Sequence, residues 1–182
     1  METMIKEVTV YEVENFRFEQ KGQAAKFLNT IQNKEFSLQQ KDLIYKGVLE
    51  DLDVSFYANP NFRFETMEII YFGLQENLNV ELYAIEELHD AQRLIIYKGL
   101  YEGLDASIFA KKEFNSLQME EIYLGLKSGV DVSIYAKSIF NWAQMKMIRI
   151  GLEEGLDVTL YANPDYSHQK MNKIRKTLQQ KD

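Results

Sequence analysis

The sequence predicts a mainly α protein, an α-solenoid built from five helix-pair repeats of 26 residues each. Two observations lead to this fold class. Residues 37–62, 63–88, 89–114, 115–140 and 141–166 align without gaps, and the same residue types recur in each copy. Hydrophobic residues make up 46% of the 182 residues, and only 2 Pro are present. This composition supports a continuous core, and stacked repeats bury an apolar face that one repeat alone leaves exposed.

Three columns of the alignment define the repeat. An isoleucine recurs at Ile44, Ile70, Ile96, Ile122, Ile148 and Ile174. A glycine follows three residues later, at Gly47, Gly73, Gly99, Gly125 and Gly151. Because Gly inside a helix costs about 1 kcal/mol relative to Ala, its recurrence at one place requires a reason. We expect close packing, through the alanine column to which Ala136 belongs; a ligand lying on bare backbone is the alternative.

Each repeat is expected to begin with an amphipathic helix. In the fourth copy this helix runs over about 116–128, with Met119, Ile122 and Leu126 on one face. Asn115 is suited to cap its first turn, and Gly129 is suited to the left-handed residue that ends a helix.

A second helix of about two turns is expected to follow from Val132, since Pro60 and Pro164 limit its length in two copies. Aspartates recur at its start, at Asp53, Asp105, Asp131 and Asp157, with Asn79 in the remaining copy. Because they appear once per repeat at a helix start, we interpret them as N-caps and not as metal ligands.

The two ends depart from the repeat. Residues 1–35 are expected to form a ββα cap, with strands over Ile5–Val13 and Phe16–Phe18 and a helix over Gln20–Gln32. Residues 36–166 then hold the five repeats. Residues 167–182 form a half-repeat that is expected to be a capping helix, and its basic residues leave a docking patch for an acidic partner as the alternative.

Catalytic chemistry finds no support in the sequence. The chain has no cysteine and only two histidines, His89 and His168, which lie in different repeats. No Gly-rich phosphate loop or metal-binding motif is present. We therefore expect no catalytic residue, no metal and no cofactor, and a protein that is not an enzyme.

One column is the candidate binding site. It follows the isoleucine column by one residue and changes from tyrosine to arginine along the chain: Tyr45, Tyr71, Tyr97, Tyr123, Arg149 and Arg175. Tyr and Arg are enriched in binding hot spots, so these side chains form a binding ladder if they are partly exposed. Boundary packing is the alternative. The next column varies, with Phe72, Leu124 and Ile150 at places where other copies have Lys46 and Lys98.

The motif of the fifth repeat resembles a repeat found in uncharacterised Firmicutes proteins, several of them from phages and conjugative elements. The residues that carry this resemblance are Gln144, Met145, Ile148, Gly151, Leu152, Gly155, Leu156, Asp157, Val158, Tyr161 and Ala162. The resemblance covers residues 37–178. It implies a helical repeat fold and an origin in a mobile element, and it implies no activity.

Charge and hydropathy narrow the partners. The net charge of −7 disfavours general binding to nucleic acid, which needs a basic surface. No apolar run approaches the roughly 20 residues that span a bilayer, and no signal peptide is visible, so we expect a cytoplasmic protein. The leading hypothesis is a protein-binding scaffold, in its sharper form an anti-CRISPR-like inhibitor of a host-defence nuclease. Nucleic-acid binding through the basic C-terminal helix and self-assembly are the alternatives.

Overall fold

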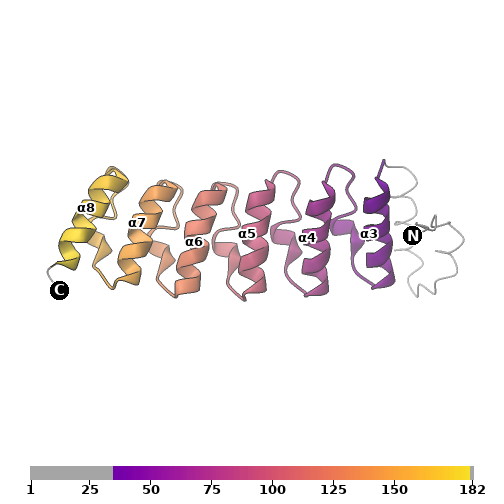
Figure 1. The fold of residues 1–182 in the computed structure, drawn as a ribbon, viewed down its shortest axis with the longest axis horizontal. Helices are drawn as coiled ribbons and strands as arrows, with labels where there is room; N and C mark the ends of the chain where they lie inside the picture. The colour runs from indigo at the N-terminus through magenta and orange to yellow at the C-terminus, as the bar shows by residue number, and fades with distance from the viewer. Residues whose placement is uncertain (1–34, 181–182) are drawn as a thin grey trace, which may run out of the picture. The chain divides into compact units, whose positions relative to one another are not determined.

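The structure is a computed structural model that describes residues 35–180, and within them it is all-helical (Figure 1). Six α-helices start at intervals of 26 residues: α3 (Leu38–Leu49), α4 (Phe64–Gln75), α5 (Asp90–Tyr101), α6 (Ser116–Ser128), α7 (Trp142–Glu153) and α8 (His168–Gln179). Between them lie five 3₁₀ helices: η1 (Val54–Phe56), η2 (Val80–Leu82), η3 (Ala106–Ile108), η4 (Val132–Ile134) and η5 (Val158–Leu160). The 26-residue helical repeat predicted from the sequence is confirmed. The expected ββα cap lies outside the described residues.

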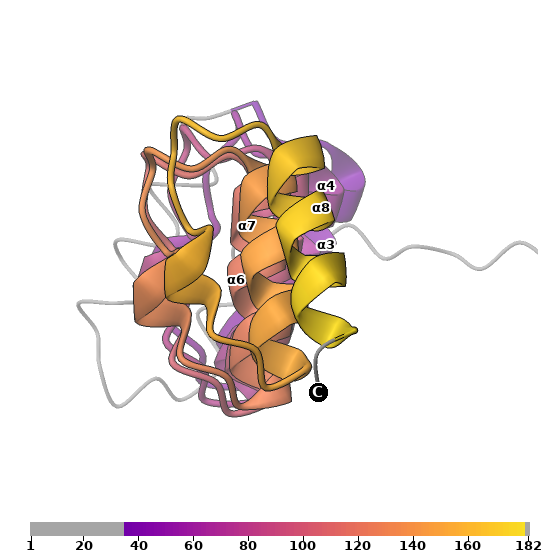
Figure 2. The same ribbon diagram turned by 90° about the vertical axis from the view of Figure 1, so that its left-hand side faces the viewer.

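The chain divides into two compact units, residues 1–71 and 72–182. The described part of the first unit holds α3, η1 and the beginning of α4. In the second unit α5, α6 and α7 each pack against the next α-helix. The 3₁₀ helices η3, η4 and η5 each pack against the α-helix before them, so that the α-helices and the 3₁₀ segments form two layers (Figure 2).

The α-helices begin and end as the sequence predicts. Asn115 caps α6 by accepting a hydrogen bond from the backbone N–H of Gln118 at 3.0 Å, and Gly129 ends the helix with a φ of +73°. The Gln118 side chain, in turn, accepts from the backbone N–H of Asn115, which completes a capping box. Its amide also donates to the carbonyl oxygen of Phe140 at 2.8 Å, so one side chain ties the start of the repeat to its end.

The second helix of each repeat is shorter than expected. It is a single 3₁₀ turn of three residues in every described copy, not an α-helix of about two turns. In the fourth repeat the backbone leaves helical conformation at Tyr135, where φ is −123°. Val132 and Tyr135 are the buried side chains of this segment, so one turn is enough to bring both against α6.

The glycine column packs against a column of aromatic residues and not against the alanine column. We call these residues the aromatic column: Tyr57, Tyr83, Phe109, Tyr135 and Tyr161. A Cβ atom on Gly125 would lie 1.9 Å from the Tyr135 hydroxyl oxygen. That hydroxyl donates to the carbonyl oxygen of Glu121 at 2.9 Å. Gly47, Gly73 and Gly151 face their own tyrosines in the same way. The prediction that these glycines allow close packing is therefore confirmed, but the neighbour is the aromatic column and not the alanine column. The tyrosine side chains cover the backbone at these glycines, so that backbone is not open to a ligand.

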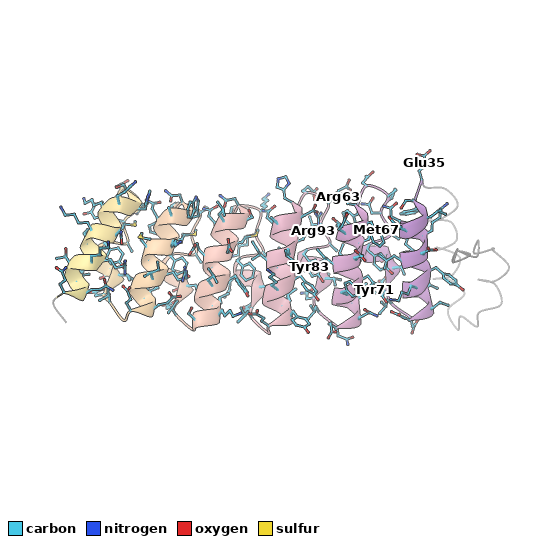
Figure 3. The ribbon with its side chains drawn as sticks, in the orientation of Figure 1. Glu35, Arg63, Met67, Tyr71, Tyr83 and Arg93 are labelled. Atoms are coloured by element: carbon cyan, nitrogen blue, oxygen red, sulfur yellow. The ribbon has the colours of Figure 1, made fainter. Side chains whose placement is uncertain are left out.

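The core of the repeats consists of the isoleucine column, the aromatic column and a column of methionines, Met67, Met119, Met145 and Met171, all fully buried. Arg93 takes the methionine position in α5 and is also buried (Figure 3). Its guanidinium donates to the backbone carbonyl oxygens of Ile85 and Leu88, and to that of Glu86 at 3.2 Å. The loop before α5 thus supplies three carbonyl acceptors to the charged side chain that replaces an apolar one.

None of the helices in residues 35–180 has the length and the apolar character needed to cross a membrane.

Candidate binding surface

The ladder side chains lie at equivalent places on α3 to α8, but their exposure differs. Tyr71 is fully buried, whereas Tyr45, Tyr97, Tyr123, Arg149 and Arg175 are half-buried. Tyr71 packs the edge of its ring against Tyr57, with the ring centroids 6.2 Å apart, and its hydroxyl donates to Glu50 (Figure 3). The partial exposure on which the binding hypothesis depends therefore holds for five ladder residues and fails for Tyr71.

Tyr71, Tyr123 and Arg175 each contact an acidic residue that comes just after the preceding α-helix, whereas Arg149 contacts Glu121 inside the preceding helix. We call such a group, with any cation beside it, a rung. In the rung between α3 and α4, Glu50 accepts the hydrogen bond from Tyr71, and the Lys46 ammonium lies 5.0 Å from the centre of the Tyr71 ring. The distance is suited to a cation–π contact.

The rung between α5 and α6 has the same parts in another arrangement. The Tyr123 hydroxyl donates to Glu102 at 3.0 Å, and the Lys127 ammonium donates to the same carboxylate oxygen at 2.9 Å. Lys127 also lies 5.7 Å from the centre of the Tyr123 ring. The hydrogen bonds from Lys127 and from Tyr123 lower the pKa of Glu102, so the carboxylate stays charged at neutral pH.

In the rung between α6 and α7 an arginine replaces the tyrosine and two carboxylates hold it. Arg149 Nε donates to Glu121 at 2.8 Å, and Arg149 Nη1 donates to both carboxylate oxygens of Glu153, at 2.8 and 2.9 Å. Ser128 donates to Glu153 at 2.6 Å. Burial alone would lower the pKa of Arg149, but the hydrogen bonds to the two carboxylates outweigh it and raise that pKa. Arg149 is therefore a structural link between two helices.

The rung between α7 and α8 is a second arginine–carboxylate link. Arg175 Nη1 donates to Glu154 Oε2 at 2.6 Å, and Arg175 Nη2 donates to Asn172 at 3.0 Å. Both Arg149 and Arg175 keep only about a tenth of their side-chain surface exposed, at 12% and 11%. The basic end of the ladder is thus bound within the chain.

The rung between α4 and α5 differs from the others, because its ladder residue Tyr97 contacts two more tyrosines. The Tyr97 ring meets Tyr83 edge-on, with the centroids 6.3 Å apart, and stacks on Tyr101 at 5.9 Å. Tyr83 is buried and Tyr101 is 61% exposed. An aromatic row therefore leads from the core beside α5 to its surface.

Sequence reasoning missed the acidic column that completes the rungs. It lies five residues after the ladder column and comprises Glu50, Glu76, Glu102 and Glu154, with Ser128 in the fourth repeat. The signal was available, since these residues recur at the same 26-residue interval as the ladder. Their importance shows only once consecutive helices lie side by side, because each acid acts on the ladder residue 21 positions later in the chain.

The variable column lies on the side of the helices that faces away from the core. Its residue Phe72 is 45% exposed, and Leu124 and Ile150 are half-buried. By the helical period, this column and its neighbours on the surface lie about 120° to 220° around the helix from the isoleucine column. We call the apolar residues on this side of α5 to α7 the outer face: Leu94, Tyr101, Leu117, Leu124, Trp142 and Ile150.

The remaining candidates for chemistry serve the fold. Asp53, Asp105, Asp131 and Asp157 each accept a hydrogen bond from the backbone N–H two residues later, at 3.0–3.1 Å, so the capping prediction is confirmed for them. These hydrogen bonds lower the pKa of Asp131, where the partner is Ser133. Asn79 makes no such bond. Residues 35–180 contain no group of three or more acidic, histidine or cysteine side chains arranged to hold a metal ion.

Comparison of the chain with protein-family models, with curated proteins and with solved structures finds no match. The resemblance to the Firmicutes repeat therefore stays a prediction.

Proposed function

We propose that this chain is a non-enzymatic, protein-binding helical-repeat scaffold, an α-solenoid in which the outer face of α5 to α7 contacts the partner. The outer face carries the proposal. Its most exposed members, Leu94, Tyr101, Leu117 and Trp142, keep 41% to 61% of their surface exposed. The isoleucine, methionine and aromatic columns form the core and hold the repeats together on the opposite side of each helix. Large apolar and aromatic side chains that the fold does not need are typical of a protein interface.

The charges of the outer face favour a protein over nucleic acid. Three acids and three lysines lie among its apolar residues on α5 to α7: Asp90, Glu120, Glu153, Lys98, Lys127 and Lys146. A surface that binds the phosphate backbone needs an excess of positive charge, and a mimic of nucleic acid needs an excess of negative charge. The balanced charge of the outer face favours neither binding to nucleic acid nor mimicry of it. If the protein inhibits a defence nuclease, we propose that it binds the nuclease through apolar contacts.

The contacts of α8 support its role as a capping helix. Met171 is fully buried against the repeat, whereas Gln169, Lys173 and Thr177, on another side of the helix, are exposed. Thr177 stands where every full repeat has the glycine of the core. A helix with one apolar side and polar residues elsewhere suits the end of a repeat array.

Site-specific photocrosslinking in the cell tests the proposal. A benzophenone amino acid replaces Tyr101 or Leu117 on the outer face, and Ser133, an exposed residue of η4 in the other layer, serves as the matched control. We expect both outer-face positions to crosslink the same protein and the control position to leave it uncrosslinked. Equal crosslinking from all three positions, or crosslinks to nucleic acid, would refute the proposed role of this face.

A further inference from the structure

Four rungs each contain a cation supplied by the chain itself. It is Lys46 between α3 and α4, Lys127 between α5 and α6, Arg149 between α6 and α7, and Arg175 between α7 and α8. In each rung the cation lies beside a carboxylate, over a tyrosine ring, or both. An acid and a cation thus recur in all four rungs, and an aromatic ring joins them in the two rungs whose ladder residue is a tyrosine.

The rung between α4 and α5 has the acid and the rings but no cation. Phe72 stands at the repeat position of Lys46, and Tyr101 stands at the repeat position of Lys127. Both positions that supply a lysine elsewhere are aromatic here. Glu76 belongs to the acidic column and is exposed, and no lysine or arginine among residues 35–180 forms an ion pair with it or lies over Tyr97 or Tyr101.

Glu76 comes just after α4, at the repeat position that Glu102 takes after α5, so its charge belongs to the same rung as Tyr97. The negative charge of Glu76 acts on Tyr97, whose pKa is raised by burial, by Tyr101 and by Glu76. Tyr97 and Tyr101 are nearly parallel, with an interplanar angle of 23°, and Tyr101 exposes more of its surface than any other aromatic residue on the outer face. In the following rung a ring and a carboxylate hold a cation, since Lys127 lies over Tyr123 and bonds to Glu102.

We propose that the rung between α4 and α5 binds a lysine or arginine side chain of the partner protein. The inference rests on the proposed function and gives the partner its chemistry. The incoming cation lies over the Tyr101 ring, which itself stacks on the ladder residue Tyr97, and it pairs with Glu76 as Lys127 pairs with Glu102 one repeat later. The net charge of −7 favours a basic segment in the partner, and the apolar residues of the outer face, with Leu94 on the same helix, contact the residues that flank the cation.

Selection of short random peptides on the purified protein tests this inference. We expect the selected peptides to share one arginine or lysine between apolar residues. Their affinity should fall about tenfold or more for Glu76→Gln, as removal of a charged hydrogen-bond partner does. Glu81→Gln is the matched control, since it removes one negative charge from an exposed position of the 3₁₀ helix η2, outside the outer face, and should leave the affinity within about twofold.

Tyr101→Lys is the second variant, because it supplies the missing cation from within the chain and copies the rung between α5 and α6. It should fold with unchanged helicity and lose the peptides. Peptides without a common basic residue, no selected peptide, or equal binding to the Glu76 and Glu81 variants would overturn the inference. Photocrosslinking from Tyr101 and Leu117 reports on the proposed function separately, so a partner crosslinked there that lacks a basic segment would refute the cation site alone.

Discussion

Replacing Gly125 with alanine puts a methyl group where the Tyr135 hydroxyl already lies. The built Cβ is 1.9 Å from the hydroxyl oxygen and 2.9 Å from a methyl carbon of Val132. In the third repeat the aromatic residue is Phe109, which has no hydroxyl, and a Cβ on Gly99 meets only the end of its ring at 2.7 Å. The chain therefore contains two versions of one contact, which differ in the hydroxyl of Tyr135 and in Val132, whose place in the third repeat is taken by Ala106.

The magnitudes separate the two substitutions. Alanine in place of glycine stabilises a helix by about 1 kcal/mol. At Gly125 this gain is opposed by overpacking, which costs about 1–3 kcal/mol, and by the displaced hydrogen bond between Tyr135 and the Glu121 carbonyl, about 1–3 kcal/mol. At Gly99 only overpacking opposes it. We expect Gly125→Ala to lower the free energy of unfolding by about 3 kcal/mol, and Gly99→Ala by about 1 kcal/mol or less.

Urea unfolding followed by circular dichroism measures both variants, and a double-mutant cycle identifies the cause. Tyr135→Phe gives the fourth repeat the contact of the third, so Gly125→Ala should be less destabilising in that background by about 1 kcal/mol or more. The reasoning is refuted if Gly99→Ala destabilises as much as Gly125→Ala, or if the effects of the two substitutions at Gly125 and Tyr135 simply add.

Three further predictions concern the side chains that link or close the repeats. Arg149→Met leaves the buried Glu121 without its cation and should lower the free energy of unfolding in urea by about 2–4 kcal/mol. A decrease of less than about 0.5 kcal/mol would show that the link between the helices contributes little. Gln118→Ala removes the capping box and the hydrogen bond to the end of the repeat and should cost about 1–3 kcal/mol, whereas Gln169→Ala, at an exposed position of α8, should cost almost nothing. Burial would raise the pKa of Glu153, but hydrogen bonds from Ser128 and Arg149 outweigh it and lower that pKa. The stability that Glu153 contributes is therefore present above its ordinary pKa of 4.5 and is lost as the pH falls through the lower pKa of the folded state. In thermal melts, acid should lower the Tm of Glu153→Gln less than it lowers the Tm of the native chain. An equal decrease of Tm with falling pH in both proteins would contradict this assignment.

The sequence predicted the features that depend on local chemistry. The helical period, the cap by Asn115, the left-handed Gly129 and the aspartate caps all follow from residue types at fixed spacing. It did not predict that Tyr135 fills the space above Gly125, because that contact depends on how the chain turns after η4. The expected two-turn helix was wrong for the same reason: an N-cap fixes where a helix begins, whereas its length here is limited by the two side chains that reach the core.

The ladder was predicted as a set of positions but not as a set of contacts. A tyrosine or arginine column indicates a binding site only where its side chains have no partner within the chain. The acids that bond to Tyr71, Tyr123 and Arg175 lie 21 residues earlier, in the preceding repeat. Once the acids are in place, Tyr71, Arg149 and Arg175 contact residues of their own chain and contribute little exposed surface. Tyr97 keeps its place in the ladder but meets Tyr101 where the next repeat has a lysine.

Repeat proteins separate the residues that maintain the stack from the residues that vary, because each repeat meets the same neighbours. Here the maintaining contacts use backbone atoms as partners: Gln118 bonds to the Phe140 carbonyl and Tyr135 to the Glu121 carbonyl. Such contacts do not depend on which side chains occupy the outer face. Phe72 and Tyr101, which stand where other repeats have a lysine, therefore alter the surface and leave the packing of the repeats unchanged. A rung that has its acid but no cation of its own is the arrangement expected where a partner protein supplies the positive charge. The region around Glu76 and Tyr101 is therefore the first place to test for binding.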